Sequence, residues 1–518
     1  MRATFGPASR RAGSFAARAC EAYHAWPAKL ATLRAMSASV FAVLLACTSP
    51  TFAQAGPAAN STAIVTQDKT LLRAAPKGSA QRQAVLWQGD TLEVRGARFD
   101  WLQVYDHRRE RAGWVRAVQV RRVSLAPDDS GELLAVTRFL RDTPGVEALG
   151  MAYAAAFLKA AAPADIGSEA FDAFGTFADR LARRASARTA QNDDDVIAAH
   201  LEVAASLGAV IRSFESDGRM QLCYDGEAFR RVLALPASDE QRARAALALT
   251  RPECVDPSLT VTQRHELDAW RADVLSRVPR TNLPEHVKNR LRVRNAAVLS
   301  ALAFQQSRRG NEATDIAQQA LAELAAVDVL QLAEEDRVAY EEAALRVGAS
   351  RWAAEASVPM KGLAITTTKG EAGQTCIGLV DAKGKAQLAP KCTYGVVWPA
   401  SQRANAAGTA LTLAVQPLEG WRELWVFRRV GAQWQVDVLP PAIGAPELGY
   451  LEFAGWVPNT TKFLAAREAR VDGQYKRTFE LIDLASLTVA NRADQPSSLS
   501  AFHRWQDAAW KRGTVALR

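Results

Sequence analysis

Hydrophobic and polar positions follow three different patterns along this chain of 518 residues. Over residues 60–123, short alternating runs separated by glycines and by Pro76 predict a small all-β barrel. Over residues 131–355, Ala, Leu, Arg and Glu recur with the spacing of one helix face, which predicts an all-α region. From residue 361 onward, strand–turn–strand patterns return and carry seven of the 13 tryptophans. The expected fold is therefore multi-domain: a β barrel over 60–123, helices over 131–355 and a Trp-rich all-β domain over 361–518.

The first 55 residues are typical of a secretory signal rather than of a folded domain. Lys29 and Arg34 precede a short apolar run over 37–46, and a small-residue pattern ending at Ala55 forms a cleavage site. Cleavage after Ala55 predicts a bacterial protein that is periplasmic or secreted. The alternative is a lipid anchor on Cys47, which ends a sequence similar to a lipoprotein signal, and only in that case is membrane attachment expected.

Residues 60–123 resemble the bacterial SH3 family in four motifs that occur in the family's order. Leu72-Arg73 followed by Pro76 matches the opening L/V-R-x-x-P, and QGDTLEV at 88–94 matches the central G-D-x-hydrophobic-x-V strand. WLQV at 101–104 matches W-x-x-V, and GWV at 113–115 matches the closing motif. The basic loop over 106–112 departs from the family, which has a short polar turn there. The resemblance implies a periplasmic or extracellular domain that binds cell-wall peptide or a partner protein, without catalysis.

The positive charge that remains after signal cleavage is concentrated in this predicted barrel. The net charge is +9, of which residues 1–55 carry +5 (six Lys/Arg less one Glu). Residues 60–122 carry +6 (twelve basic less six acidic residues), which leaves −2 for residues 123–518. An anionic ligand held by guanidinium groups and aromatic faces is therefore expected here, and nucleic acid is not, because the body of the chain is nearly neutral. The candidate ligand-binding residues are Trp87, Trp101, Trp114, Arg108, Arg109 and Arg111. The alternative is a solvated loop, with at least two of the tryptophans in the core.

Two further resemblances concern the other regions. Residues 296–321, with a turn at Gly310-Asn311, resemble one tetratricopeptide-type helix pair, with an ordinary helical hairpin as the alternative. Residues 450–490 partly match a blade of the periplasmic β-propeller repeats, starting at Trp456. An incomplete propeller and a β-sandwich are both compatible with residues 361–518.

Four cysteines follow the signal region, and an even number in an exported chain predicts disulfides. Two of them lie in the helical region and two in the C-terminal β region, so the expected pairs are Cys223–Cys254 and Cys376–Cys392. A zinc site is the alternative, but no CxxC or HxxxH spacing supports it. No metal and no cofactor is therefore expected.

The sequence contains no recognisable catalytic motif. HExxH, G-x-S-x-G and phosphate-binding loops do not occur, and Cys223 is the one thiol worth considering as a nucleophile. We therefore predict no catalytic residue and expect a secreted, non-catalytic envelope protein that binds peptidoglycan or a partner protein. The alternatives are a peptidoglycan hydrolase with its active site in the helical region and a lipid-anchored assembly factor.

Overall fold

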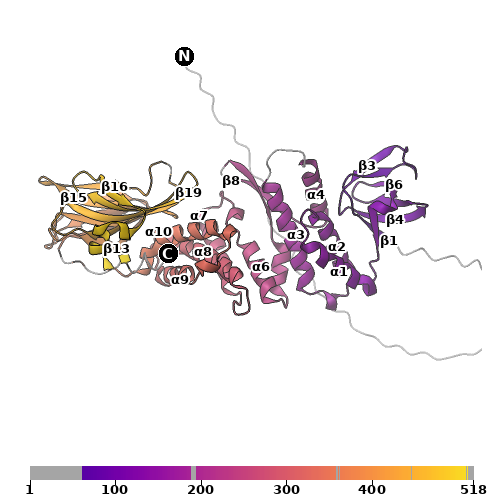
Figure 1. Cartoon of the computed structure of the whole chain (residues 1–518), viewed down its shortest axis with the longest axis horizontal. Helices are drawn as coiled ribbons and strands as arrows, with labels where there is room; N and C mark the ends of the chain where they lie inside the picture. Colours follow the sequence, from indigo (N-terminus) through magenta and orange to yellow (C-terminus); the bar gives the residue numbers. More distant parts are fainter. Residues whose placement is uncertain are drawn as a thin grey trace, which may run out of the picture. The chain divides into compact units, whose positions relative to one another are not determined.

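The computed structural model describes residues 61–511 apart from 188–193, 217, 358, 359, 361, 445 and 509 (Figure 1). The predicted signal segment, with Cys47 and Ala55, lies outside the described residues. Along the chain, a β region, a helical region and a second β region follow one another, so the predicted order is confirmed. Within the described ranges, we find no helix with the length and apolar character needed to span a bilayer.

Seven antiparallel strands form the N-terminal β region. They are β1 (Ser61–Val65), β2 (Thr70–Arg73), β3 (Arg82–Leu86), β4 (Thr91–Arg98), β5 (Trp101–Asp106), β6 (Arg111–Arg116) and β7 (Val120–Val123), with the short helix η1 (Ala117–Gln119) before β7. Their order in the sheet is β3-β2-β6-β5-β4-β1-β7. Alternate residues such as Leu102 and Val104 are buried in one core. A Cβ at Gly113 would lie 2.7 Å from the Leu72 side chain, so glycine fits the close approach of β6 to β2.

Ten α-helices make up the described helical region. They are α1 (Ser130–Arg141), α2 (Glu147–Ala160), α3 (Ser168–Ser186), α4 (Asp194–Ser206), α5 (Glu227–Ala234), α6 (Asp239–Leu249), α7 (Val261–Ser276), α8 (Glu285–Arg308), α9 (Thr314–Ala325) and α10 (Arg337–Ser350). Short helices η4 (Pro252–Cys254), η6 (Glu334–Asp336) and η7 (Arg351–Ala354) join or end them. Capping boxes begin α6 (Ser238 with Gln241) and α7 (Thr260 with Gln263), where hydroxyl and amide groups bond free backbone N–H groups.

A β-hairpin interrupts the helices, and the expectation of an all-α region was wrong at this point. It consists of β8 (Ile211–Ser216) and β9 (Arg219–Tyr224), which pair in register from Ile211–Tyr224 to Ser216–Arg219. Gly218, which has a φ of +71°, suits the turn of this hairpin, but within a long helical pattern such a glycine also suits the end of a helix. The predicted helical hairpin does form: α8 and α9 are joined at Gly310, which has a φ of +76°.

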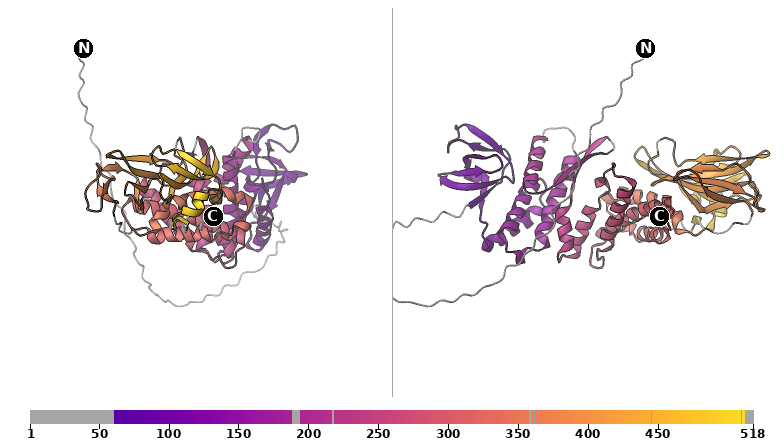
Figure 2. Two further views of the ribbon diagram at one scale, coloured as in Figure 1. Left: turned by 60° about the vertical axis from the view of Figure 1, so that its left-hand side comes forward. Right: turned by 180° about the vertical axis from the view of Figure 1, so that it is seen from behind.

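The C-terminal β region, drawn in orange to yellow in Figure 2, contains a three-stranded sheet and an eight-stranded sheet, and the larger sheet is divided here into two layers of four strands. The first layer is β10 (Ala364–Lys369), β11 (Thr375–Val380) and β12 (Lys391–Thr393); the second is β13 (Val396–Ala404), β14 (Ala410–Leu418), β15 (Trp421–Val430) and β16 (Gln433–Leu439); the third is β17 (Gly449–Trp456), β18 (Lys462–Val471), β19 (Gln474–Asp483) and β20 (Val489–Ala493). Two residue pairs between β15 and β17 join the second and third layers into one sheet.

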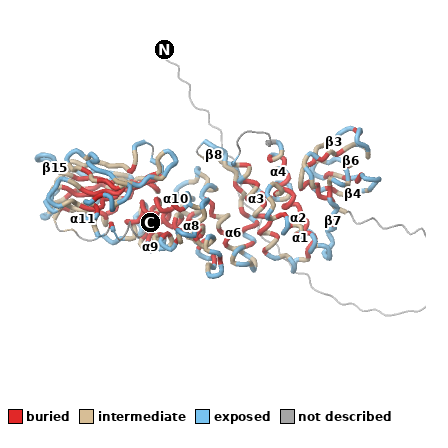
Figure 3. Tube along the Cα trace, in the orientation of Figure 1, coloured by how far each residue is buried: buried red, intermediate tan, exposed pale blue. Residues whose placement is uncertain are grey.

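Side chains of β15 point alternately to the first and to the third layer. Phe427 belongs to the core shared with Ile377 of β11, and Val426 belongs to the core shared with Leu451 of β17. The helix α11 (Ser500–Trp505) joins the core on the other face of β17 and β18. Buried residues accordingly concentrate along the strands of this region (Figure 3). The arrangement is a layered stack of small meanders, one of which covers residues 450–490, and the described strands close no ring.

Both predicted disulfides are present in the structure. Cys223 of β9 is bonded to Cys254 of η4, and Cys376 of β11 is bonded to Cys392 of β12. Cys376 and Cys392 are direct cross-strand neighbours. Each bond therefore links segments of one region.

Candidate functional site

Buried carboxylates hold the arginines of the β5–β6 loop. Asp106, whose side chain is 2% exposed, accepts hydrogen bonds from the backbone N–H groups of Arg108 (3.0 Å) and Arg109 (3.2 Å). Nη1 of Arg109 lies 2.7 Å from Asp106, and its Nη2 lies 3.1 Å from Asp90, which is also 3.6 Å from Nη2 of Arg108. Burial alone would lower the pKa of Arg109, but hydrogen bonds and charges of the two carboxylates raise it. Both guanidinium groups are therefore neutralised within the fold.

The other predicted ligand residues also form contacts within the fold or are at least partly buried. Arg111 donates from Nη1 to the backbone carbonyl of Gln83 (3.1 Å). Trp101 is buried, and Trp87 and Trp114 are half-buried. The structure thus brings Arg108 and Arg109 to Asp90 instead of leaving them for an anion. Counting charges along the chain could not show this pairing, because Asp90 belongs to a different turn.

An exposed apolar tip, defined here as Phe99 and Val118, was not predicted. Phe99 lies in the turn between β4 and β5, is 93% exposed and has a φ of +54°. Val118 of η1 is 79% exposed, and a hydrogen bond from the Ala117 N–H to the Asp100 carbonyl (2.9 Å) holds η1 beside the turn. The Arg98 guanidinium lies 6.0 Å from the centre of the Phe99 ring. An aromatic residue in a turn between two alternating strands was the signal in the sequence.

A histidine links the N-terminal β region to the helices. Nε2 of His200 in α4 lies 2.8 Å from Oδ1 of Asp68, and its Nδ1 lies 3.2 Å from Nη2 of Arg184. Because arginine can only donate, Nδ1 accepts and Nε2 carries the proton that is donated to Asp68. Burial raises the pKa of Asp68, but hydrogen bonds from His200 and from the Gln88 backbone outweigh it, so this pKa is lowered overall.

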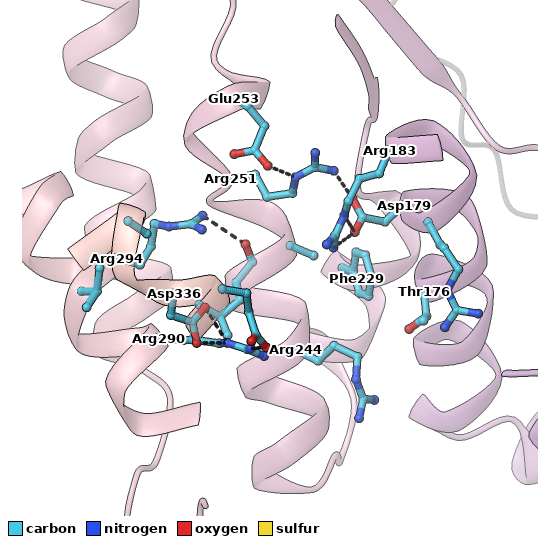
Figure 4. A pocket seen from close by; sticks show the side chains of 16 residues that line it. Thr176, Asp179, Arg183, Phe229, Arg244, Arg251, Glu253, Arg290, Arg294 and Asp336 are labelled. Carbon is cyan, nitrogen blue, oxygen red and sulfur yellow. Dashed lines mark hydrogen bonds and ion pairs between the residues drawn. The ribbon is translucent and has the colours of Figure 1, made fainter. Parts of the chain in front are cut away.

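The helical region contains a partly open cavity of about 590 Å³ (Figure 4). Six arginines line it: Arg180, Arg183, Arg244, Arg251, Arg290 and Arg294. Four carboxylates also line it: Asp179, Glu253, Glu335 and Asp336. The formal charge of the lining is therefore +2 (six less four). Phe229 and Val293 add apolar surface.

Four of these six arginines contact carboxylates. The pairs are Arg183–Asp179, Arg251–Asp179, Arg251–Glu253, Arg290–Glu335, Arg290–Asp336 and Arg244–Asp172. Arg251 joins two acids, with Nη1 2.5 Å from Asp179 and Nε 2.8 Å from Glu253. These pairs fix the positions of the charged groups and cancel much of their charge.

Arg294 and Arg180 contact backbone carbonyls instead, and no carboxylate in the described part of the chain lies within ion-pair distance of either. Arg294 donates from Nη1 to the carbonyl of Thr250 (2.6 Å), where α6 ends. Arg180 donates to the carbonyls of Thr143 (3.2 Å) and Arg141 (2.8 Å) at the end of α1. Arg294 and Arg180 are therefore the two lining arginines that have no carboxylate partner among the described residues.

The electrostatic surroundings of Arg294 are unfavourable for a cation. The pKa of Arg294 is lowered to about 10, mainly by burial; the guanidinium groups of Arg271, Arg251 and Arg183 contribute to this decrease, and the charge of Glu253 opposes it. A cation with these neighbours is stabilised by an added anion.

The histidines and cysteines considered from the sequence lie outside the described lining of the cavity. No His, Cys or Ser is among the described residues that line it. Cys223, the thiol considered from the sequence, is in a disulfide and carries no free thiol. His107 contacts Glu93, and His200 contacts Asp68, both away from the cavity lining. Over the described ranges, no group of three or more His, Cys, Asp or Glu is placed to hold a metal ion.

Sequence reasoning missed this cavity because its arginines come from separate helices. Arg290 and Arg294, four residues apart on one helix, share a face of α8 and were the local signal. Comparison of the whole chain with protein-family models, curated proteins and solved structures found no match. Function is therefore inferred from the residues and their contacts.

Proposed function

We propose that this chain is a non-catalytic binding protein of the bacterial cell envelope, and that its N-terminal β region docks onto a partner protein through the exposed apolar tip. The resemblance of residues 60–123 to bacterial SH3 domains supports the proposal, because such domains bind wall peptide or partner proteins. Two disulfides agree with an oxidising compartment.

The exposure of Phe99 and Val118, on two segments joined by the hydrogen bond from Ala117 to Asp100, is the observation that carries the proposal. Single exposed apolar residues are common on protein surfaces, whereas contiguous apolar patches mark interaction sites. Phe99 also has a left-handed backbone conformation, which costs on the order of 1 kcal/mol for a residue other than glycine. Arg98, over the ring, supplies a guanidinium of the kind enriched in binding hot spots.

The character of the tip favours a protein over the cell wall as the partner. A phenyl ring gains free energy when it leaves water for an apolar pocket, which a protein surface can supply. The polar wall would instead interact with charged side chains, and Arg108 and Arg109 are already paired with Asp90.

The test uses the full chain as bait with envelope extract of the source bacterium and, separately, with purified peptidoglycan. Phe99→Ser should weaken capture of a specific protein by about tenfold or more, the loss expected when an anchor worth about 1.4 kcal/mol is removed. Phe139→Ser is the matched control, because Phe139 of α1 is 76% exposed but lies outside the tip. Equal capture by wild type and Phe99→Ser, or peptidoglycan binding that does not depend on Phe99, would contradict the proposal.

A further inference from the structure

The arginine-lined cavity of the helical region carries positive charge that the fold does not neutralise. We propose that this cavity binds a small organic dianion, with the guanidinium of Arg294 as the principal contact. This site is separate from the exposed tip, and its ligand does not depend on the docking proposed there.

Two unpaired guanidinium groups point to a dianion. Four of the lining arginines have carboxylate partners, one of which, Asp172, lies behind the lining, whereas Arg294 and Arg180 have none among the described residues. A guanidinium that is partly withdrawn from water, as that of Arg294 is, is unfavourable unless an anion or hydrogen bonds compensate it. The two carbonyl groups that face Arg294 give hydrogen bonds but no compensating charge. A ligand with two negative charges would supply a counter-charge for each of the two unpaired guanidinium groups, Arg294 and Arg180.

The geometry of Arg294 suits an oxygen-rich anion. Its hydrogen bonds to described residues all use Nη1, so Nε and Nη2 keep their N–H groups for a ligand. A carboxylate or phosphate can accept two parallel hydrogen bonds from these adjacent nitrogens. The Thr250 carbonyl holds the guanidinium in place before the ligand arrives, which reduces the entropy lost on binding.

The rest of the lining limits which anions fit. A volume of about 590 Å³ is that of a small-molecule site. Asp179 and Glu253 repel a long polyanion, and Phe229 and Val293 give apolar surface to a short carbon chain. The ligand class is therefore a compact dianion with a short apolar segment, either a dicarboxylate or a phosphate monoester. Figure 4 shows Arg294 and Asp336 on one side of the cavity and Arg183 and Asp179 on the other.

Calorimetric titration of the full chain tests the proposal with four probes at matched ionic strength: glutarate, n-propyl phosphate, inorganic phosphate and the monoanion butyrate. We expect saturable binding of at least one of the two organic dianions and binding of butyrate weaker by about tenfold or more. Glutarate and n-propyl phosphate distinguish the carboxylate from the phosphate source. Inorganic phosphate binding as tightly as the organic probes would contradict the assigned apolar segment.

Arg294→Gln should weaken binding of the preferred dianion by about tenfold or more, because it removes a charge-assisted pair of hydrogen bonds. Arg308→Gln is the matched control, since Arg308 is an exposed arginine of the same helix outside the lining. Arg294→Lys keeps the positive charge but lacks the planar guanidinium, so it should also weaken binding. This second variant tests the proposal even if Arg294→Gln does not fold. Unchanged affinity in a folded Arg294 variant, equal loss in Arg308→Gln, or no binding of any dianion by wild type would overturn the proposal.

Discussion

Arg109 contacts two carboxylates at once, and both are nearly inaccessible to water. Asp106 and Asp90 are 2% and 4% exposed, so each needs a partner inside the protein. The β5–β6 loop is therefore held by ion pairs, although seen along the chain it is a run of basic residues. Trp101 is likewise engaged within the fold, because the guanidinium of Arg116 covers its ring at 4.4 Å from the ring centre. A charged or aromatic side chain is available to a ligand only where no tertiary contact within the fold already occupies it.

Replacing Asp106 by asparagine should destabilise the N-terminal β region by about 1.5–3 kcal/mol, because a charged acceptor with several hydrogen bonds is lost. Asp100→Asn is the control: Asp100 also pairs with an arginine, Arg116, but its side chain is 60% exposed, and such pairs contribute about 0–1 kcal/mol. Urea denaturation of both variants measures the difference. Equal effects of the two substitutions would show that the loop does not depend on the buried carboxylate.

Elements whose partners are close in sequence could be predicted. The α8–α9 pair and both disulfides join segments within a few tens of residues, so helical spacing, turn residues and cysteine count were sufficient. The β8–β9 hairpin was missed because it lies inside a long helical pattern. The layering of the C-terminal strands was left open, because alternation tells which residues are buried and not which layer covers them.

The Cys223–Cys254 bond ties β9 to the turn after α6 across 31 residues. On the chain-entropy relation, a loop of this size stabilises by about 3–4 kcal/mol. Replacing both cysteines by alanine should therefore lower the unfolding free energy of the helical region by roughly that amount, measured by the far-ultraviolet circular dichroism signal during denaturation.

The matched control for this variant is the double alanine substitution of Cys376 and Cys392. This pair lies in the C-terminal β region, so its loss should act on tryptophan fluorescence there more than on the helical signal. Non-reducing peptide mapping of the wild type checks the pairing. A peptide that links Cys254 to Cys376 would refute the assignment of one bond to each region.

At the scale of the whole molecule, the arginine-lined cavity and the exposed apolar tip both depend on elements that are far apart in sequence. The cavity takes charges from α3, α6, η4, α8 and η6, and the exposed tip takes residues from the β4–β5 turn and η1. The sequence shows that arginines are numerous in the helices, but not which carboxylate each one meets. The pairing of each arginine with a carboxylate depends on which helices contact one another. Only the three-dimensional structure therefore shows that Arg294 lacks an acidic partner among the described residues.

The helical region and the C-terminal β region are joined by a buried group of three charges. Nε of Arg351 in η7 lies 2.6 Å from Oε1 of Glu452, and Nη2 of Arg422 lies 3.2 Å from Oε2. Burial lowers the pKa of Arg422, and the charge of Glu452 opposes that effect. A Cβ at Gly348 of α10 would lie 2.4 Å from the Tyr450 ring, which shows how closely α10 approaches β17.

Replacing Glu452 by glutamine keeps the shape of the side chain but leaves two buried guanidinium groups without a carboxylate. Breaking a buried ion pair from one side costs about 3–5 kcal/mol, so the midpoint of urea denaturation should fall markedly. Because Glu452 contacts an arginine of each region, we expect the helical circular dichroism signal and the tryptophan fluorescence to shift together. Glu447→Gln is the control, since Glu447 is 55% exposed and 3.9 Å from Arg470, and it should change stability by no more than about 0.5 kcal/mol. A shift of the fluorescence alone would mean that Glu452 stabilises the β layers without coupling them to the helices.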